Sequence, residues 1–238
     1  VIVDPADEGR RQAQVAQPSQ RVRHRPAGRL LAVGHRAVKH LAPLAFQLGG
    51  CASAPYAKGE STATGLQAVA DTLSRADSSL DASIAALNDL PSGEGDLRRR
   101  FNRFSVSVDR LANDANRVRG EADAMKAESE SYFKWWEQQV ASVQNEDLRV
   151  ASAERRQKIR NDFAAIDASF QELRNLYTPF MNNLRDLQIV LGSNLSLATV
   201  ASVQPMIVRA GQEGAAVQNA LNRLADQYRA LGLSLSFN

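Results

Sequence analysis

The sequence has one cysteine and three histidines in 238 residues, and none of these residues lies after position 51. From residue 52 onward the chain therefore cannot form a Cys–His catalytic pair, a zinc site with these ligands or an internal disulfide. It also has no glycine-rich phosphate loop after a strand, because no segment is a convincing strand. Paired carboxylates could catalyse glycoside hydrolysis in principle, but no sequence feature favours them. We therefore expect a protein that is not an enzyme and that binds no metal or cofactor.

The charge is divided unevenly along the chain. Residues 1–50 contain eight basic and three acidic residues, a net charge of +5, together with His24, His35 and His40. The remaining 21 basic and 23 acidic residues give −2. The two parts therefore differ in character, and we interpret residues 1–50 as a leader that is removed.

The end of this leader has the order of a secretory signal. Basic and histidine residues at 35–40 precede the short apolar stretch 41–48, and Gly49 and Gly50 suit a signal peptidase. The apolar stretch is shorter than the roughly 20 residues that a transmembrane helix needs. Residues 1–35 have no sustained apolar period, so a true start near residue 33 is an alternative.

Leu48-Gly49-Gly50-Cys51 resembles the bacterial lipobox, whose cysteine is diacylated and becomes the new N-terminus. We therefore predict lipidation at Cys51 and a membrane partner through this anchor, since two or more acyl chains hold a protein stably. Ala52 follows the cysteine in place of Asp, which by resemblance to enterobacterial sorting favours the outer membrane of a Gram-negative cell. The alternative is an N-terminal helix fragment with an incidental cysteine. Residues 51–61 are small and polar, and we expect a lipidated tether.

Apolar residues recur at heptad spacing through most of residues 62–238, which predicts an all-α domain. We expect an elongated antiparallel coiled-coil-like bundle of three to four long helices. The defining apolar positions run from Leu66 to Leu87, from Phe101 to Val143, from Ile159 to Leu191 and from Val200 to Leu231.

Local signals predict where these helices end. Asp96 is a plausible N-cap after the Pro91–Gly95 break. The second and third heptad runs are out of phase by two residues, which predicts a chain reversal near Asn145–Asp147. We expect a kink rather than a break at Pro179, and at Pro205 either a kink or the first turn of the last helix.

The second and third helices are the longest, at roughly 70–75 Å for about 50 and 45 residues. Because short connections make neighbouring helices antiparallel, their far end should protrude as a two-helix hairpin beyond the other helices. The lipidated Cys51 would then be tethered on the side of the hairpin tip. The terminal stretch 231–237 alternates with period two, and we expect a tail packed on the bundle rather than a strand.

Aromatic and basic residues gather near the predicted tip. Phe133 and Trp135 lie off the heptad seam, and Arg155 and Arg156 begin the third helix. These four residues are a hypothetical contact with a membrane or a partner protein. The alternative is that Trp136 fills the seam and the arginines form a solvated face. Arg98–Arg100 with Arg103 is interpreted as a solvated helix start, because nucleic acid does not suit an acidic, exported chain.

Residues 95 to about 231 resemble a bacterial family of lipoproteins known as domain of unknown function twenty-nine fifty-nine. The resembling residues are Gly95-Asp-Leu97, Trp136-Glu137, Arg149 through Ile159, Pro179-Phe180 and Leu184–Asn194. Trp135 departs from the family's single-tryptophan pattern. The resemblance implies a helical fold and a place in the envelope, and it implies no activity or active site.

Together these patterns predict a periplasmic lipoprotein, anchored to the outer membrane, that acts as a structural or protein-interaction component of the envelope. The alternative is a helical carrier that binds a lipid or another amphiphile. The regular heptads favour a closed core and hence the first interpretation. No residue pattern identifies a small-molecule substrate, and envelope proteins are the expected partners.

Overall fold

A computed structural model describes residues 56–93 and 95–236, all but the connections of which are helical. The predicted leader and Cys51 lie outside the described residues. The helices are α1 (Ala57–Asp89), η1 (Leu90–Ser92), α2 (Leu97–Ala141), α3 (Glu146–Ser193), α4 (Leu197–Ser202) and α5 (Gln204–Leu235). The described residues contain no strand, and the predicted all-α bundle with long helices is confirmed.

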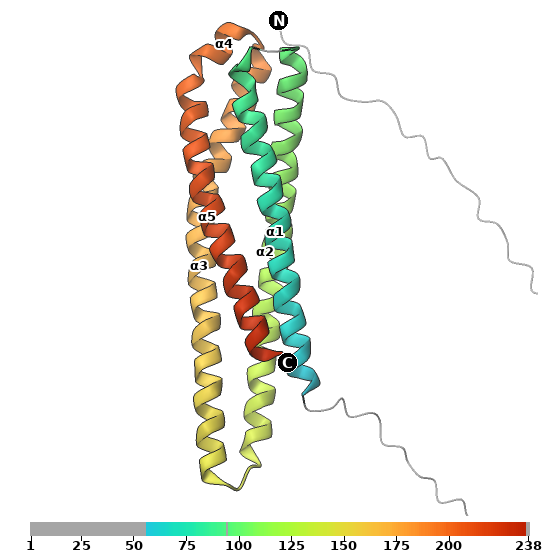
Figure 1. The fold of residues 1–238 in the computed structure, drawn as a ribbon, viewed down its shortest axis with the longest axis vertical. Helices are drawn as coiled ribbons and strands as arrows, with labels where there is room; N and C mark the ends of the chain where they lie inside the picture. Colours follow the sequence, from blue (N-terminus) through green and yellow to red (C-terminus); the bar gives the residue numbers. More distant parts are fainter. Residues whose placement is uncertain (1–55, 94, 237–238) are drawn as a thin grey trace, which may run out of the picture. The chain divides into compact units, whose positions relative to one another are not determined.

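The long helices run antiparallel to their sequence neighbours (Figure 1). The end of α1, the start of α2, the end of α3 and the short α4 lie together at one end of the bundle. At the other end the connection between α2 and α3 extends beyond the start of α1 and the end of α5. The protruding two-helix hairpin is therefore confirmed, and α1 begins on the side of its tip.

Side-chain caps explain two of the predicted boundaries. The Asp96 carboxylate accepts a hydrogen bond from the Arg98 backbone N–H (2.9 Å), as an N-cap does. The Asn145 side chain accepts one from the Leu148 N–H (3.0 Å) at the start of α3. The chain therefore reverses where the heptad phase slips, although no glycine or proline marks the turn.

The two internal prolines behave differently. Helix α3 continues through Pro179, so a break there is excluded. Pro205 lies in the first turn of α5, where its missing N–H costs no helical hydrogen bond. The last helix is therefore not one rod, because α4 ends at Ser202 and α5 begins at Gln204.

Two predicted boundaries were wrong. Helix α1 begins at Ala57, inside the segment assigned to the tether, because its first turns are packed in the bundle, with Gly59, Thr62 and Ala63 buried. At the other end, residues 231–235 continue α5, so the predicted tail is helical. Leu231 and Leu235 are both buried, four residues apart, because they lie on the same face of the helix.

Helix α1 packs closely against both α2 and α5, and α5 also packs against α3, whereas α2 and α3 contact each other much less. The buried apolar residues of the four long helices form one continuous core. On α3 a row of buried residues repeats every seven positions: Ile159, Ile166, Leu173, Phe180 and Leu187. None of the described helices has a stretch long and apolar enough to cross a membrane.

Candidate functional site: a cleft between α2 and α3

A cleft of about 630 Å³ lies between α2 and α3 in the described residues. It runs from Leu111 to Phe133 on α2 and from Phe163 to Arg185 on α3. Residues of α1 and α5, including Leu80, Val217, Leu221 and Tyr228, form its floor. Its volume lies within the range of small-molecule sites, about 300–1,000 Å³.

Two rows of residues at heptad spacing line the cleft. The aromatic row of α3 consists of Phe163, Phe170 and Tyr177, and the small row of α2 consists of Ala115, Ala122 and Ser129. The aromatic row is only partly buried, in contrast to the buried row of α3 next to it. The small side chains of α2 do not fill the space in front of these rings, so apolar surface stays accessible.

The cleft is limited at the tip by aromatic packing between the helices. The rings of Phe133 and Phe163 meet edge to face with centroids 5.7 Å apart, and the Arg160 guanidinium lies 4.8 Å above the Phe133 ring. Beyond the other end, Gln188 Nε2 donates to the Ser105 backbone oxygen (3.3 Å). Both contacts join α2 to α3, so the cleft is bounded along the hairpin.

The rim of the cleft is charged, and the two signs are separated. Toward the tip lie Asp123, Glu130 and Asp167, together with Lys126, which pairs with Asp167 across the rim (3.3 Å). Toward the four-helix end lie Arg119, Arg174 and Arg185, which form the basic end of the cleft. Along each helix the carboxylates that line the cleft lie on the tip side of the arginines, with Asp123 one helical turn from Arg119 on α2.

The charged neighbours of two tyrosines in the cleft follow the same separation of positive and negative residues. Burial raises the pKa of Tyr177 to about 12, while the neighbouring Arg185 and Arg119 guanidinium groups act in the opposite direction. Burial also raises the pKa of Tyr228 to about 12, and there the Asp167 and Asp123 carboxylates add to the rise. One phenol therefore lies in a positive environment and the other in a negative one.

The structure places the four predicted tip residues in different environments. Phe133 is only 6 % exposed, so the prediction that it contacts a membrane or partner was wrong. Its ring belongs to the core, where it packs against the Phe163 ring of α3. Trp135 is partly buried and its ring stacks on Tyr132 with centroids 6.1 Å apart.

Each of the two predicted arginines joins α3 to another helix of the chain. Arg155 is exposed and donates to the Ser234 backbone oxygen near the end of α5 (3.0 Å). Arg156 pairs with Glu137 of α2 (3.6 Å). Trp136 Nε1 also links the two helices, by donating to Ser152 Oγ (2.9 Å). These contacts join helices of the chain to one another, and whether a partner also binds there stays a prediction.

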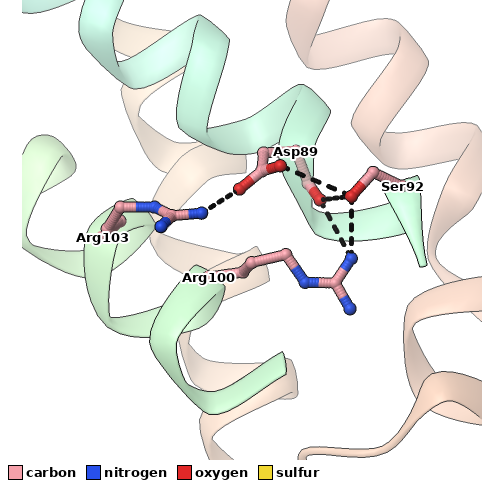
Figure 2. A network of polar contacts seen from close by, with 4 residues as sticks. All are labelled: Asp89, Ser92, Arg100 and Arg103. Carbon is pink, nitrogen blue, oxygen red and sulfur yellow. Dashed lines mark hydrogen bonds and ion pairs between the residues drawn. The ribbon is translucent and has the colours of Figure 1, made fainter. Parts of the chain in front are cut away.

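The basic cluster at the start of α2 is solvated except at one position, since Arg98, Arg99 and Arg103 are exposed. Arg100 is buried, and Figure 2 shows its Nη1 reaching the Asp89 backbone oxygen (3.3 Å) and Ser92 Oγ (2.9 Å). Arg103 forms an ion pair with the Asp89 carboxylate. The Arg100 side chain therefore donates hydrogen bonds to the last residue of α1 and to η1, and it is not part of a solvated face.

Neither the cleft nor its basic end was found from the sequence. The available signal was the small row of α2, whose members stand at successive heptad positions opposite a helix rich in Phe. Within residues 56–93 and 95–236, no group of three or more His, Cys, Asp or Glu residues is placed to hold a metal ion.

A family model described as "Protein of unknown function (DUF2959)" matches residues 53–229, well over half of the chain. The chain belongs to this family, as the sequence resemblance indicated. Comparison with curated proteins and with solved structures gave no significant match.

Proposed function

We propose that this member of the DUF2959 family is an envelope lipoprotein whose helical bundle binds the apolar chain of an amphiphile between α2 and α3. The observation that carries the proposal is the cleft of about 630 Å³, lined by the aromatic row of α3 and floored by buried leucine and valine side chains. A bundle that only maintains its shape gains stability by closing such a space, since each missing methylene contact costs packing energy. The proposed role is binding without catalysis.

The lipoprotein part of the proposal is supported by the order of basic residues, apolar stretch, Gly-Gly and Cys51 in the sequence. It places the protein in the periplasm, anchored to the outer membrane. Replacing the thiol in Cys51→Ser removes the acylation site, so the variant should leave the membrane fraction of a Gram-negative host. A Cys51→Ser protein that fractionates with the membrane as the wild type does would overturn the anchor.

Ligand binding is tested on residues 52–238, which contain the whole described bundle without the cysteine. Isothermal titration with dodecanol, an uncharged single-chain amphiphile, should give saturable binding. Ala115→Phe places a ring into the cleft and should abolish that binding. The matched control Ala124→Phe adds the same ring to an exposed position of α2 outside the cleft and should leave binding unchanged.

Two results would contradict the proposal. One is the absence of any binding to the wild-type bundle, and the other is equal binding by the Ala115→Phe and Ala124→Phe proteins. Circular dichroism of both variants shows whether each keeps the helical fold, so loss of binding can be separated from loss of structure.

The second candidate function is the structural or protein-interaction role in the envelope. It is favoured by the α2–α3 hairpin, which extends past the other helices and is free of them at its tip (Figure 1). Crosslinking through a photoreactive residue at exposed Leu148 should capture an envelope protein in cells, and the same residue at exposed Val208 on α5 is the control. Identical crosslinking patterns from the two positions would argue against a partner for the tip.

A further inference from the structure

The charges of the basic end of the cleft are not used within the bundle. Among the described residues, neither Arg174 nor Arg185 has a carboxylate within ion-pair distance. Arg119 makes one hydrogen bond to the Asn116 side chain (3.1 Å) and likewise has no ion pair. The carboxylates of the rim are instead concentrated toward the tip, where Lys126 pairs with Asp167. The apolar cleft therefore has one end suited to an anion.

The Tyr177 hydroxyl adds a donor at the same end. Tyr177 is the last member of the aromatic row and lines the cleft, and both Arg119 and Arg185 lie near enough to influence its ionisation. A phenol that stays protonated donates a hydrogen bond, and a guanidinium binds a carboxylate in a planar, bidentate manner. Two helices thus bring three donors to one place.

The dimensions of the cleft select the apolar part of the ligand. Tyr177 and Phe163 are separated by about 21 Å along α3, at about 1.5 Å per residue. One acyl chain reaches about 15 Å, half of a bilayer core of about 30 Å, so the cleft accommodates one extended chain. A partner helix, about 10 Å across, would have to break the contacts that join α2 and α3 at both ends and at the Lys126–Asp167 pair.

We infer that the ligand is a single-chain anionic amphiphile, a long-chain carboxylate, with its headgroup between Arg119 and Arg185 beside Tyr177 and its chain along the aromatic row toward Phe163. This inference rests on the proposed function, because it specifies the ligand of the same cleft. The site accounts for the separated charges of the rim, which an uncharged ligand would not require.

The test compares dodecanoate with dodecanol, which differ only at the headgroup, by isothermal titration at neutral pH. Wild-type protein should bind dodecanoate about tenfold or more tightly, which corresponds to about 1.4 kcal/mol. Arg119→Gln/Arg185→Gln should weaken dodecanoate binding far more than dodecanol binding, so that the preference for dodecanoate is lost. The matched control Arg110→Gln/Arg117→Gln removes two exposed charges of α2 outside the cleft and should keep the wild-type preference.

Each result has one meaning for the inference. If wild-type protein binds both compounds equally, or if both double variants lose the preference alike, the anionic headgroup site is refuted while the cleft remains a binding site. If it binds neither compound, the proposed function fails and the inference fails with it. Unchanged helical circular dichroism of the double variants shows that a lost preference does not come from unfolding.

Discussion

Gly214 lies where three helices meet, and replacing it with alanine should cost stability. A Cβ atom at this position of α5 would lie 2.7 Å from Ile84 Cδ1 of α1 and 3.2 Å from Phe180 Cε2 of α3. Phe180 is fully buried and cannot move away, whereas Ile84 is only partly buried and its end can turn. The absence of a side chain at Gly214 therefore permits the close approach of α5 to α1 and α3.

Two opposing effects determine how much Gly214→Ala changes the free energy of unfolding. Alanine is better than glycine in a helix by about 1 kcal/mol, while inserting a methyl group into a packed core costs about 1–3 kcal/mol. We therefore expect Gly214→Ala to destabilise the fold by up to about 2 kcal/mol. Gly120 of α2 has no other atom within 4 Å of the equivalent Cβ, so Gly120→Ala should stabilise by about 1 kcal/mol.

Urea denaturation followed by circular dichroism measures both variants on residues 52–238. The difference between the two free energies of unfolding isolates the overpacking, since the helix propensity gain is common to both. Adding Ile84→Val removes the atom at 2.7 Å and should recover part of the loss, as a favourable coupling in a double-mutant cycle. If Gly214→Ala stabilised the protein as much as Gly120→Ala does, the described packing of α5 would be refuted.

Two further predictions concern buried polar groups. Arg100 Nη1 makes its hydrogen bonds to Asp89 and Ser92, but Nε has no partner in the described residues, so the buried charge offsets much of what these bonds contribute. Arg100→Met roughly keeps the side-chain volume, so its free energy of unfolding in urea should be about 2 kcal/mol higher than that of Arg100→Ala. Equal free energies of unfolding for the two variants would contradict this. Burial raises the pKa of Tyr177 and Tyr228 from 10.0 to about 12. The folded state thus holds these protons more tightly, so stability should be full below pH 10 and fall between pH 10 and about 12. Melting temperatures measured across this range should fall less in a Tyr177→Phe/Tyr228→Phe protein, and an identical fall would count against the shifts.

The helices and their turns could be predicted because their signals are local. The heptad phase slip located the reversal at Asn145, and the sequence around Asp96 identified its cap. The family was also recognised from residues spread along these helices. The periodicity does not specify which neighbour a buried face packs against, so the burial of Phe133 and Arg100 could not be predicted. Arg100 is buried because the end of α1 needs a donor, and that need arises only after α1 and α2 are placed together.

The start of α1 and the end of α5 were missed for a related reason. Each segment contains a glycine, Gly59 or Gly232, which disfavours a helix when the segment is judged alone, and residues 231–235 alternate with period two. In the folded protein they extend α1 and α5 because buried residues of each helix pack against the other: a Cβ on Gly232 would lie 3.3 Å from the Ala63 backbone oxygen and 3.5 Å from Leu66 Cβ. Tertiary packing therefore decides the length of these helices, and propensity does not.

The cleft follows from the same uneven packing. Glycine and alanine residues bring α1 and α5 close together, and α2 and α3 each attach to one of them. On the remaining side of the bundle, α2 and α3 are joined by the Phe133–Phe163 contact at the tip and by the Gln188 hydrogen bond at the other end. Between these two points the aromatic row of α3 faces the small row of α2. The α2 side chains are too small to fill the space in front of the rings, and this space is the cleft. A regular heptad pattern indicated a closed core because it counts apolar positions and not their volumes. An acyl chain in the cleft would supply the volume that Ala115, Ala122 and Ser129 leave out, without requiring α1 and α5 to separate.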